Sequence, residues 1–113
     1  MTAVFRVAVA VEALTGLALV ASPAWVVWLI LGHDLATGAV VPGRIAGLAL
    51  LAFAAACWHW PNATARRAIL LFQPLIAVPL LGVALVSALG GPLLWPAILY
   101  HVGAGVTLSR GRG

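Results

Sequence analysis

The chain has 113 residues, of which 65% are hydrophobic and only 7% are charged. A soluble domain carries about 25% charged residues. Six arginines and two acidic residues cannot cover a soluble surface of this size, so the composition excludes an ordinary soluble domain and predicts an integral membrane protein. The net charge of +4 comes from arginines placed singly or in pairs at the ends of apolar stretches. That placement indicates membrane orientation rather than nucleic-acid binding.

The first apolar segment, at about residues 3–21, is long enough to cross a bilayer, which takes about 20 residues at 1.5 Å each. Ser22-Pro23 follows it and is typical of an N-cap with proline at the first helical position. We therefore expect a separate short helix at about 23–31, lying near the membrane interface. The alternative is one tilted helix with a kink at Pro23.

Three further apolar segments follow the polar, glycine-containing connection that begins at Gly32. The turn after Trp60 offers Asn62 or Thr64 as an N-cap. Gly90-Gly91-Pro92 separates the last two segments. The segments cover about residues 42–60, 65–89 and 92–108. The sequence thus predicts one all-α domain over residues 1–113, an integral membrane four-helix bundle with a short interfacial helix after the first span.

Arginine placement predicts the orientation of these spans. With four spans, both termini and the turn after Trp60 share one side of the membrane. That side carries Arg6, Arg66, Arg67, Arg110 and Arg112, and the other side carries only Arg44. Arginine-rich loops stay in the cytoplasm, so we expect cytoplasmic termini. The high Ala, Val, Leu, Gly and Arg content without lysine suggests a bacterium with GC-rich DNA, and we therefore expect the protein in a bacterial inner membrane.

Tryptophans are expected to anchor the bundle at both interfaces, where amphipathic rings favour the headgroup level. In the four-span arrangement, Trp58 and Trp60 lie at the inner interface. Trp25, Trp28 and Trp95 lie at the outer one. The two sets therefore agree with the orientation that the arginines predict.

Small residues are expected to bring the helices together, because close backbone approach replaces apolar burial as the attraction between helices in lipid. Gly16, Gly43, Gly47 and Gly103 are the candidates. They serve packing within the bundle or an interface with another helix. The expected partners are the lipid bilayer and other transmembrane subunits or a second copy of the chain, with no nucleic acid.

Ionisable and polar side chains inside the spans form the candidate functional cluster, because each costs about 2.5–3.5 kcal/mol on insertion scales. Glu12 lies at the centre of the first span, and His101 lies one residue past the centre of the fourth. Gln73 lies somewhat toward the cytoplasmic side of the third span. A Glu12–His101 contact is compatible with their depths, and Arg44 is a rival partner for Glu12. The cluster either fixes helix register, takes part in proton or ligand binding, or contacts a cofactor or partner subunit.

The sequence predicts no metal site and no cofactor. His33, His59 and His101 fall at different depths, which argues against a bis-histidine haem and a three-histidine metal site. His101 alone could provide the single axial ligand of a chlorophyll-type pigment. Cys57 is the only cysteine and is interpreted as a packing residue. No catalytic motif is present, so we predict a non-catalytic protein rather than an enzyme.

Two family resemblances bear on function. The chain resembles the small multidrug resistance transporters in size and in having Glu12 near the middle of its first span, although the third span and His101 depart from that pattern. It is more similar to the DoxX-like small four-span proteins of bacteria. That likeness lies in the segment from Glu12 to Gly16, the break at Pro23, Arg44-Ile45-Ala46-Gly47 at the start of the second span, and Trp95-Pro96 at the start of the fourth.

The DoxX-like resemblance implies a four-span fold and, as for some members, a role as accessory subunit of a membrane oxidoreductase. The leading functional prediction is therefore a non-catalytic accessory or scaffolding subunit of a larger respiratory or photosynthetic complex. The first alternative is a small proton-coupled transporter or channel that uses Glu12, with His101 tuning it. The second is a small membrane enzyme acting on a lipid or quinone, with His101 and Glu12 as acid and base.

Overall fold

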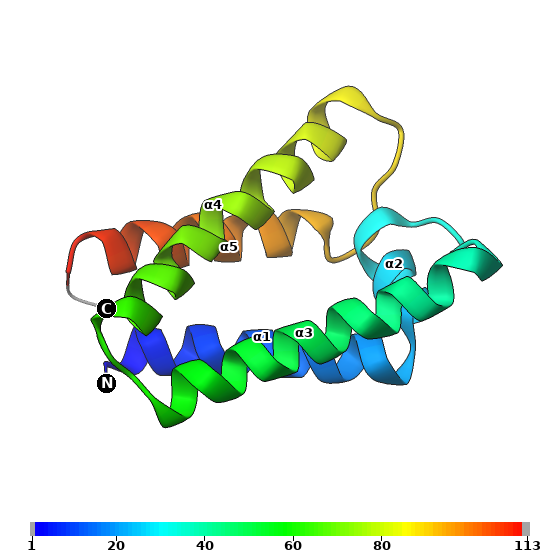
Figure 1. The fold of residues 1–113 in the computed structure, drawn as a ribbon. Coiled ribbons are helices and arrows are strands. Elements are labelled where there is room, and N and C mark those ends of the chain that lie inside the picture. Colours follow the sequence, from blue (N-terminus) through cyan, green and yellow to red (C-terminus); the bar gives the residue numbers. More distant parts are fainter. Residues whose placement is uncertain (1, 112–113) are drawn as a thin grey trace.

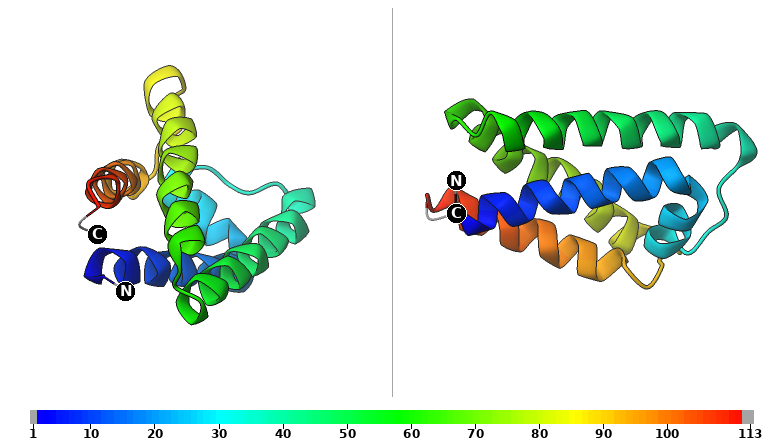
Figure 2. Two further views of the ribbon diagram at one scale, coloured as in Figure 1. Left: turned by 60° about the vertical axis from the view of Figure 1, so that its left-hand side comes forward. Right: turned by 90° about the horizontal axis from the view of Figure 1, so that it is seen from below.

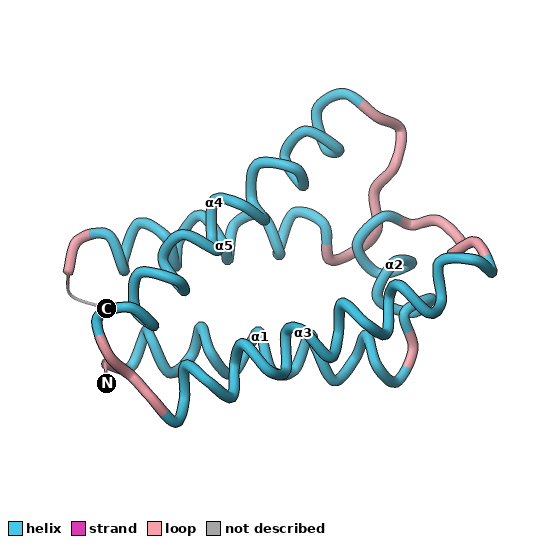
Figure 3. Tube along the Cα trace, viewed as in Figure 1, coloured by secondary structure: helices cyan, strands magenta, loops and turns pink. Residues whose placement is uncertain are grey.

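The computed structural model describes residues 2–111, which form helices joined by turns and loops, and it confirms the all-α fold class (Figures 1 and 3). The helices are α1 (Ala3–Ala21), α2 (Pro23–Leu31), the 3-10 helix η1 (Thr37–Ala39), α3 (Val40–His59), α4 (Ala63–Val86) and α5 (Leu94–Ser109). The helix expected near residues 42–60 thus begins slightly earlier, and α4 begins directly after the cap at Asn62.

Side-chain caps determine where three of the helices begin, because the first backbone N–H groups of a helix have no partner within it. The Thr2 hydroxyl accepts a hydrogen bond from the backbone of Phe5 at 3.4 Å. The Ser22 hydroxyl accepts one from Trp25 at 3.3 Å, and Ser22 itself is extended. α1 and α2 are therefore two separate helices rather than one helix kinked at Pro23. The Asn62 carboxamide oxygen caps α4 by accepting from Ala65 at 2.9 Å.

The connection between α4 and α5 is longer than the sequence indicated. α4 ends at Val86 instead of near residue 89, and α5 begins at Leu94 instead of at Pro92. Backbone N–H groups of this connection donate to the last carbonyl groups of α2 instead of continuing a helix. The bonds run from Gly90 to Leu31, from Gly91 to Ile30 and from Leu93 to Leu29, at 2.8, 2.9 and 2.8 Å. They satisfy carbonyls that the end of α2 leaves free.

The helices form two antiparallel pairs, α1 with α3 and α4 with α5, and α2 closes one end between them (Figures 1 and 2). The first and last described residues lie together at the opposite end. α4 diverges from α1 and α3 toward its C-terminal end (Figure 1). Pro74 and Pro79 lie inside α4, and each removes one backbone donor from that helix.

Glycines set the close approach of α1 and α3. A Cβ atom on Gly47 would lie 2.7 Å from the Gly16 carbonyl oxygen, and a Cβ on Gly16 would lie 2.8 Å from the Gly47 carbonyl oxygen. Gly43 meets the ring of Pro23 in the same way, with a Cβ-to-Cβ distance of 2.8 Å. Three of the four packing glycines expected from the sequence therefore lie at contacts within the bundle. For the fourth, Gly103, nothing lies within 4 Å of an added Cβ.

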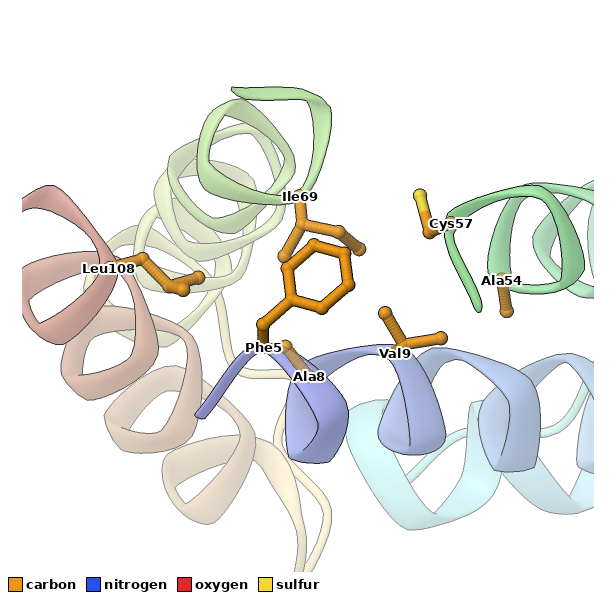
Figure 4. Close-up of a cluster of buried hydrophobic side chains, with 7 residues drawn as sticks. All are labelled: Phe5, Ala8, Val9, Ala54, Cys57, Ile69 and Leu108. Carbon is orange, nitrogen blue, oxygen red and sulfur yellow. The ribbon is translucent and has the colours of Figure 1, made fainter. Parts of the chain in front are cut away.

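A buried apolar cluster joins four helices at the end of the bundle that holds the termini (Figure 4). The α1 face contributes three side chains, and the side chain of Ile69 on α4 points toward that of Phe5. The members of the cluster are Phe5, Ala8, Val9, Ala54, Cys57, Ile69 and Leu108. Cys57 is 3% exposed, which agrees with its interpretation as a packing residue.

Large apolar side chains also cover the outside of the bundle. Leu14, Leu75 and Leu99 are 65%, 61% and 67% exposed. Three helices, namely α1, Thr37–His59 (η1 with α3) and α4, are long and apolar enough to cross a membrane. α5, with 16 residues, is shorter, at about 24 Å. An apolar surface of this extent, on helices of this length, indicates a membrane protein.

The contact between α1 and α3 predicts opposite outcomes for two glycine substitutions. Gly47→Ala forces the helices apart and should cost about 1–3 kcal/mol of stability, as overpacking does. Gly82→Ala is the matched control, because nothing lies within 4 Å of a Cβ there and alanine favours the helix by about 0.5–1 kcal/mol. Thermal unfolding in mild detergent measures both. Equal stability of the two variants would contradict the close contact.

Candidate functional site

Three buried polar side chains from three helices lie in one layer of the bundle. Glu12 on α1, Gln73 on α4 and His101 on α5 are 2%, 0% and 8% exposed. The start of α1, the start of α4 and the end of α5 all lie at the end of the bundle that holds the termini. Measured from there along each helix axis, Glu12, Gln73 and His101 lie about 14, 15 and 12 Å away. The polar layer is therefore level across the bundle and near the middle of its long helices.

The polar layer directly follows the apolar cluster along α1 and α4. Glu12 lies one turn after Ala8 on α1, and Gln73 lies one turn after Ile69 on α4. Residues four apart share one helix face, so the face that buries the apolar cluster also turns these polar groups inward. Their burial thus follows from the helical periodicity of the apolar positions.

His101 and Gln73 are joined by a hydrogen bond of 2.8 Å between the imidazole Nδ1 and the carboxamide Oε1. The Gln73 Nε2 donates to the backbone carbonyl of Ile69 at 3.0 Å. A carbonyl oxygen can only accept, so the Ile69 contact fixes which end of the Gln73 amide is the NH₂ group. Oε1 therefore faces His101, and Nδ1 must carry the proton that it donates. The neutral imidazole then has its unprotonated nitrogen at Nε2.

Aromatic rings surround the imidazole. Tyr100 lies edge-on to His101 with ring centroids 5.0 Å apart, and Phe72 does so at 6.3 Å. Phe53 on α3 packs against Phe72 at 5.6 Å. The hydrogen bond between His101 and Gln73 is therefore buried beside apolar and aromatic groups, which strengthens it.

Glu12 is not bonded as the sequence suggested. The Nδ1 of His101 is occupied by Gln73, and the buried Glu12 Oε1 atom has no hydrogen-bond partner in the described part of the chain. The Tyr100 hydroxyl is also buried and without a partner. Arg44, the rival partner, is exposed near the start of α3 and lies outside the polar layer. Burying an oxygen without a hydrogen-bond partner costs stability. Glu12 Oε1 and the Tyr100 hydroxyl therefore mark a place where a proton or a ligand group can be accommodated.

Two apolar grooves flank the layer. The larger, of about 560 Å³, runs between α4 and α5, and its lining includes His101, Pro74, Ala77 and Gly105. The smaller, of about 270 Å³, lies between α1 and α5 beside Tyr100. The larger volume is within the usual range for small-ligand sites, about 300–1,000 Å³.

The other candidate side chains lie at the two ends of the bundle. His33 and His59 are exposed, and each bonds a backbone carbonyl through Nδ1, at 2.8 and 2.9 Å. The predicted anchors are all exposed, with Trp58 and Trp60 at the terminal end and the other three at the α2 end. They are Trp25, Trp28, Trp58, Trp60 and Trp95. Within residues 2–111 no group of three or more His, Cys, Asp or Glu side chains could hold a metal ion.

The charged residues divide between the same two ends. Arg6, Arg66, Arg67 and Arg110 lie at the terminal end, whereas Arg44 and Asp34 lie at the α2 end. Arg112, which the sequence also assigned to the terminal side, lies outside the described residues. The long apolar helices therefore separate an arginine-rich end from an arginine-poor one.

The His101–Gln73 bond was not foreseen, although the sequence contained a signal for it. Gln73 is ten residues after the start of α4, and His101 is eight residues before the end of α5. In an antiparallel pair these positions are level. Comparison with known proteins adds nothing to this site, since no family model, curated protein or solved structure matches the chain.

Proposed function

We propose that this protein is a non-catalytic accessory or scaffolding subunit of a larger complex, respiratory or photosynthetic, in the inner membrane of a bacterium. It crosses the bilayer four times and packs its outer helix faces against partner helices and lipid. The observation that carries the proposal is that small residues on its outer surface have no partner among residues 2–111. Gly82 on α4 and Gly103 on α5 have nothing within 4 Å of an added Cβ.

The fourth crossing rests on the environment of α5. This helix packs on both α4 and α1. At the α2 end the connection that precedes α5 extends it, and the N–H groups of Gly90, Gly91 and Leu93 are bonded to carbonyl groups of α2. Such bonds favour this connection at membrane depth, where irregular backbone is tolerated only if its polar groups have partners. The longest dimension of the protein, 38 Å, also suits a hydrocarbon core of about 30 Å with its interfaces.

Arginine placement supports cytoplasmic termini. Four described arginines lie at the terminal end and one at the α2 end, where Asp34 also lies. The excess of arginine on one side sets the orientation of short-loop membrane proteins. The exposed tryptophans at both ends support the same placement, since their rings favour the interface.

Contact with other helices is supported by the way the glycines are used. Gly16 and Gly47 pack against each other between α1 and α3, so they are not available for contact with a helix of another subunit. Gly82 and Gly103 remain free on faces where small residues would let another helix approach closely. The sequence likeness to DoxX-like proteins, some of which are accessory subunits of membrane oxidoreductases, supports the same class of function.

Purification of the tagged full-length protein from its native membrane in mild detergent tests this proposal. We expect a stable assembly with other membrane subunits. Gly103→Leu should release the partner while leaving the fold intact, because the added side chain enters open space. Ala10→Leu, at an exposed position on α1, is the matched control and should leave the assembly unchanged. A lone monomer from the unaltered protein would overturn the proposal.

A proton-coupled transporter is the second candidate, and the buried Glu12 oxygen without a partner is the observation that favours it. A carboxyl group in this setting can exchange a proton as its surroundings change. The Tyr100 hydroxyl, also buried and without a partner, could assist that exchange. The likeness to small multidrug resistance transporters at Glu12 points the same way.

Proton flux into proteoliposomes, followed with a trapped pH-sensitive dye, separates the two candidates. A transporter loses its flux in Glu12→Gln, because the amide cannot carry the proton. Thr15→Val is the control on the same helix, since the Thr15 hydroxyl only bonds the Val11 carbonyl of its own helix at 2.8 Å. Equal flux in the Glu12→Gln variant and the unaltered protein excludes the transporter.

A further inference from the structure

We propose that the α4–α5 groove binds a membrane-soluble quinol, whose phenolic hydroxyl donates a hydrogen bond to the Nε2 of His101. This inference goes beyond the proposed subunit function, since it assigns a ligand to a surface that scaffolding alone does not require.

The chain leaves His101 Nε2 available to a ligand. No hydrogen bond from residues 2–111 reaches this atom. Among the described residues, the buried polar atoms without partners are Glu12 Oε1 and the Tyr100 hydroxyl, so Nε2 is not enclosed by protein. His101 lines the larger groove. The imidazole ring of His101 therefore meets whatever occupies that groove, and Nε2 is its nitrogen without a partner among residues 2–111.

Two hydrogen bonds in series, from Gln73 to Ile69 and from His101 to Gln73, make the Nε2 of His101 an acceptor. The Ile69 carbonyl orients the Gln73 amide, and the amide oxygen then holds the proton on Nδ1 of His101. An unprotonated Nε2 can only accept a hydrogen bond. In hydrocarbon no water supplies the missing donor, so a ligand of this site has to bring one.

The groove complements a quinol ring rather than a charged or strongly polar molecule. Its lining is apolar apart from His101 and Ser109, and the Ser109 hydroxyl is already bonded to the Val106 carbonyl at 2.8 Å. Its volume of about 560 Å³ holds a substituted aromatic ring with part of an isoprenoid tail. A quinol carries the required O–H donor on an apolar body. The matching quinone carries only acceptors and cannot bond an unprotonated nitrogen.

Binding of duroquinol, duroquinone and duroquinol dimethyl ether to the full chain in lipid nanodiscs tests the proposal. The three probes share one apolar ring, and duroquinol alone of them has a hydroxyl donor. Under anaerobic conditions we expect duroquinol to bind about tenfold more tightly than the other two, as one net hydrogen bond allows. Equal affinity for the three, or no binding of duroquinol, would overturn the proposal.

Nitrogen NMR of the histidine-labelled protein shows where the probe binds. We expect duroquinol to shift the unprotonated Nε2 resonance of His101 and to leave those of His33 and His59 unchanged. A protonated Nε2 in the ligand-free protein, or a shift confined to His33 or His59, would contradict the site.

Two variants complete the test. The double variant Gln73→Leu with His101→Leu replaces both bonded partners with apolar groups, which spares the fold, and should reduce duroquinol binding to the level of duroquinone. Thr15→Val, on α1 and outside the lining of the groove, should leave binding unchanged. Binding of a zinc chlorin through His101, without duroquinol binding, would replace the quinol by a pigment and overturn the proposal.

Discussion

Hydrogen-bond satisfaction without water is the constraint on which the rest of this structure depends. Hydrocarbon offers no donors or acceptors, so polar groups between the ends of the long helices need partners within the chain. The carbonyls at the end of α2 are satisfied by the connection that precedes α5, and the amide of Gln73 is satisfied by Ile69 and His101. These bonds tie α2 to α5 and α4 to α5. The glycine contact between α1 and α3 then supplies close packing where apolar burial contributes little.

The side-chain exceptions to this constraint among residues 2–111 lie in one layer. Glu12 Oε1 and the Tyr100 hydroxyl are buried without partners, and His101, whose Nε2 accepts no hydrogen bond from these residues, lines an apolar groove. All three belong to residues at the middle of α1 and α5, far from the charged ends. Groups left unsatisfied in such a position are retained at a cost in stability, which is the reason for assigning function to this layer. The subunit, transporter and quinol proposals use different parts of the same layer and surface, so their tests are independent.

Much of the fold follows from local signals in the sequence. Ser22-Pro23 and Asn62 begin helices where capping chemistry predicts, and apolar length gives α1, α3 and α4. The start of α5 could not be predicted, because Gly90 and Gly91 bond to α2, a tertiary contact that no local pattern encodes. Burial of Glu12, Gln73 and His101 was predictable from their place within apolar spans. Their pairing was not, because it depends on the rotation of α4 against α5.

The most direct test of the membrane placement is the sidedness of single cysteines introduced at Ala3, Gly38 and Ser109. The native Cys57, which is buried, is replaced by alanine beforehand. A membrane-impermeant maleimide applied to intact cells should label Gly38→Cys alone, and all three positions should react after the membrane is opened. This result would place both ends of the chain in the cytoplasm, as four crossings require. Labelling of Ser109→Cys, but not Ala3→Cys, in intact cells would place the termini on opposite faces and contradict the account.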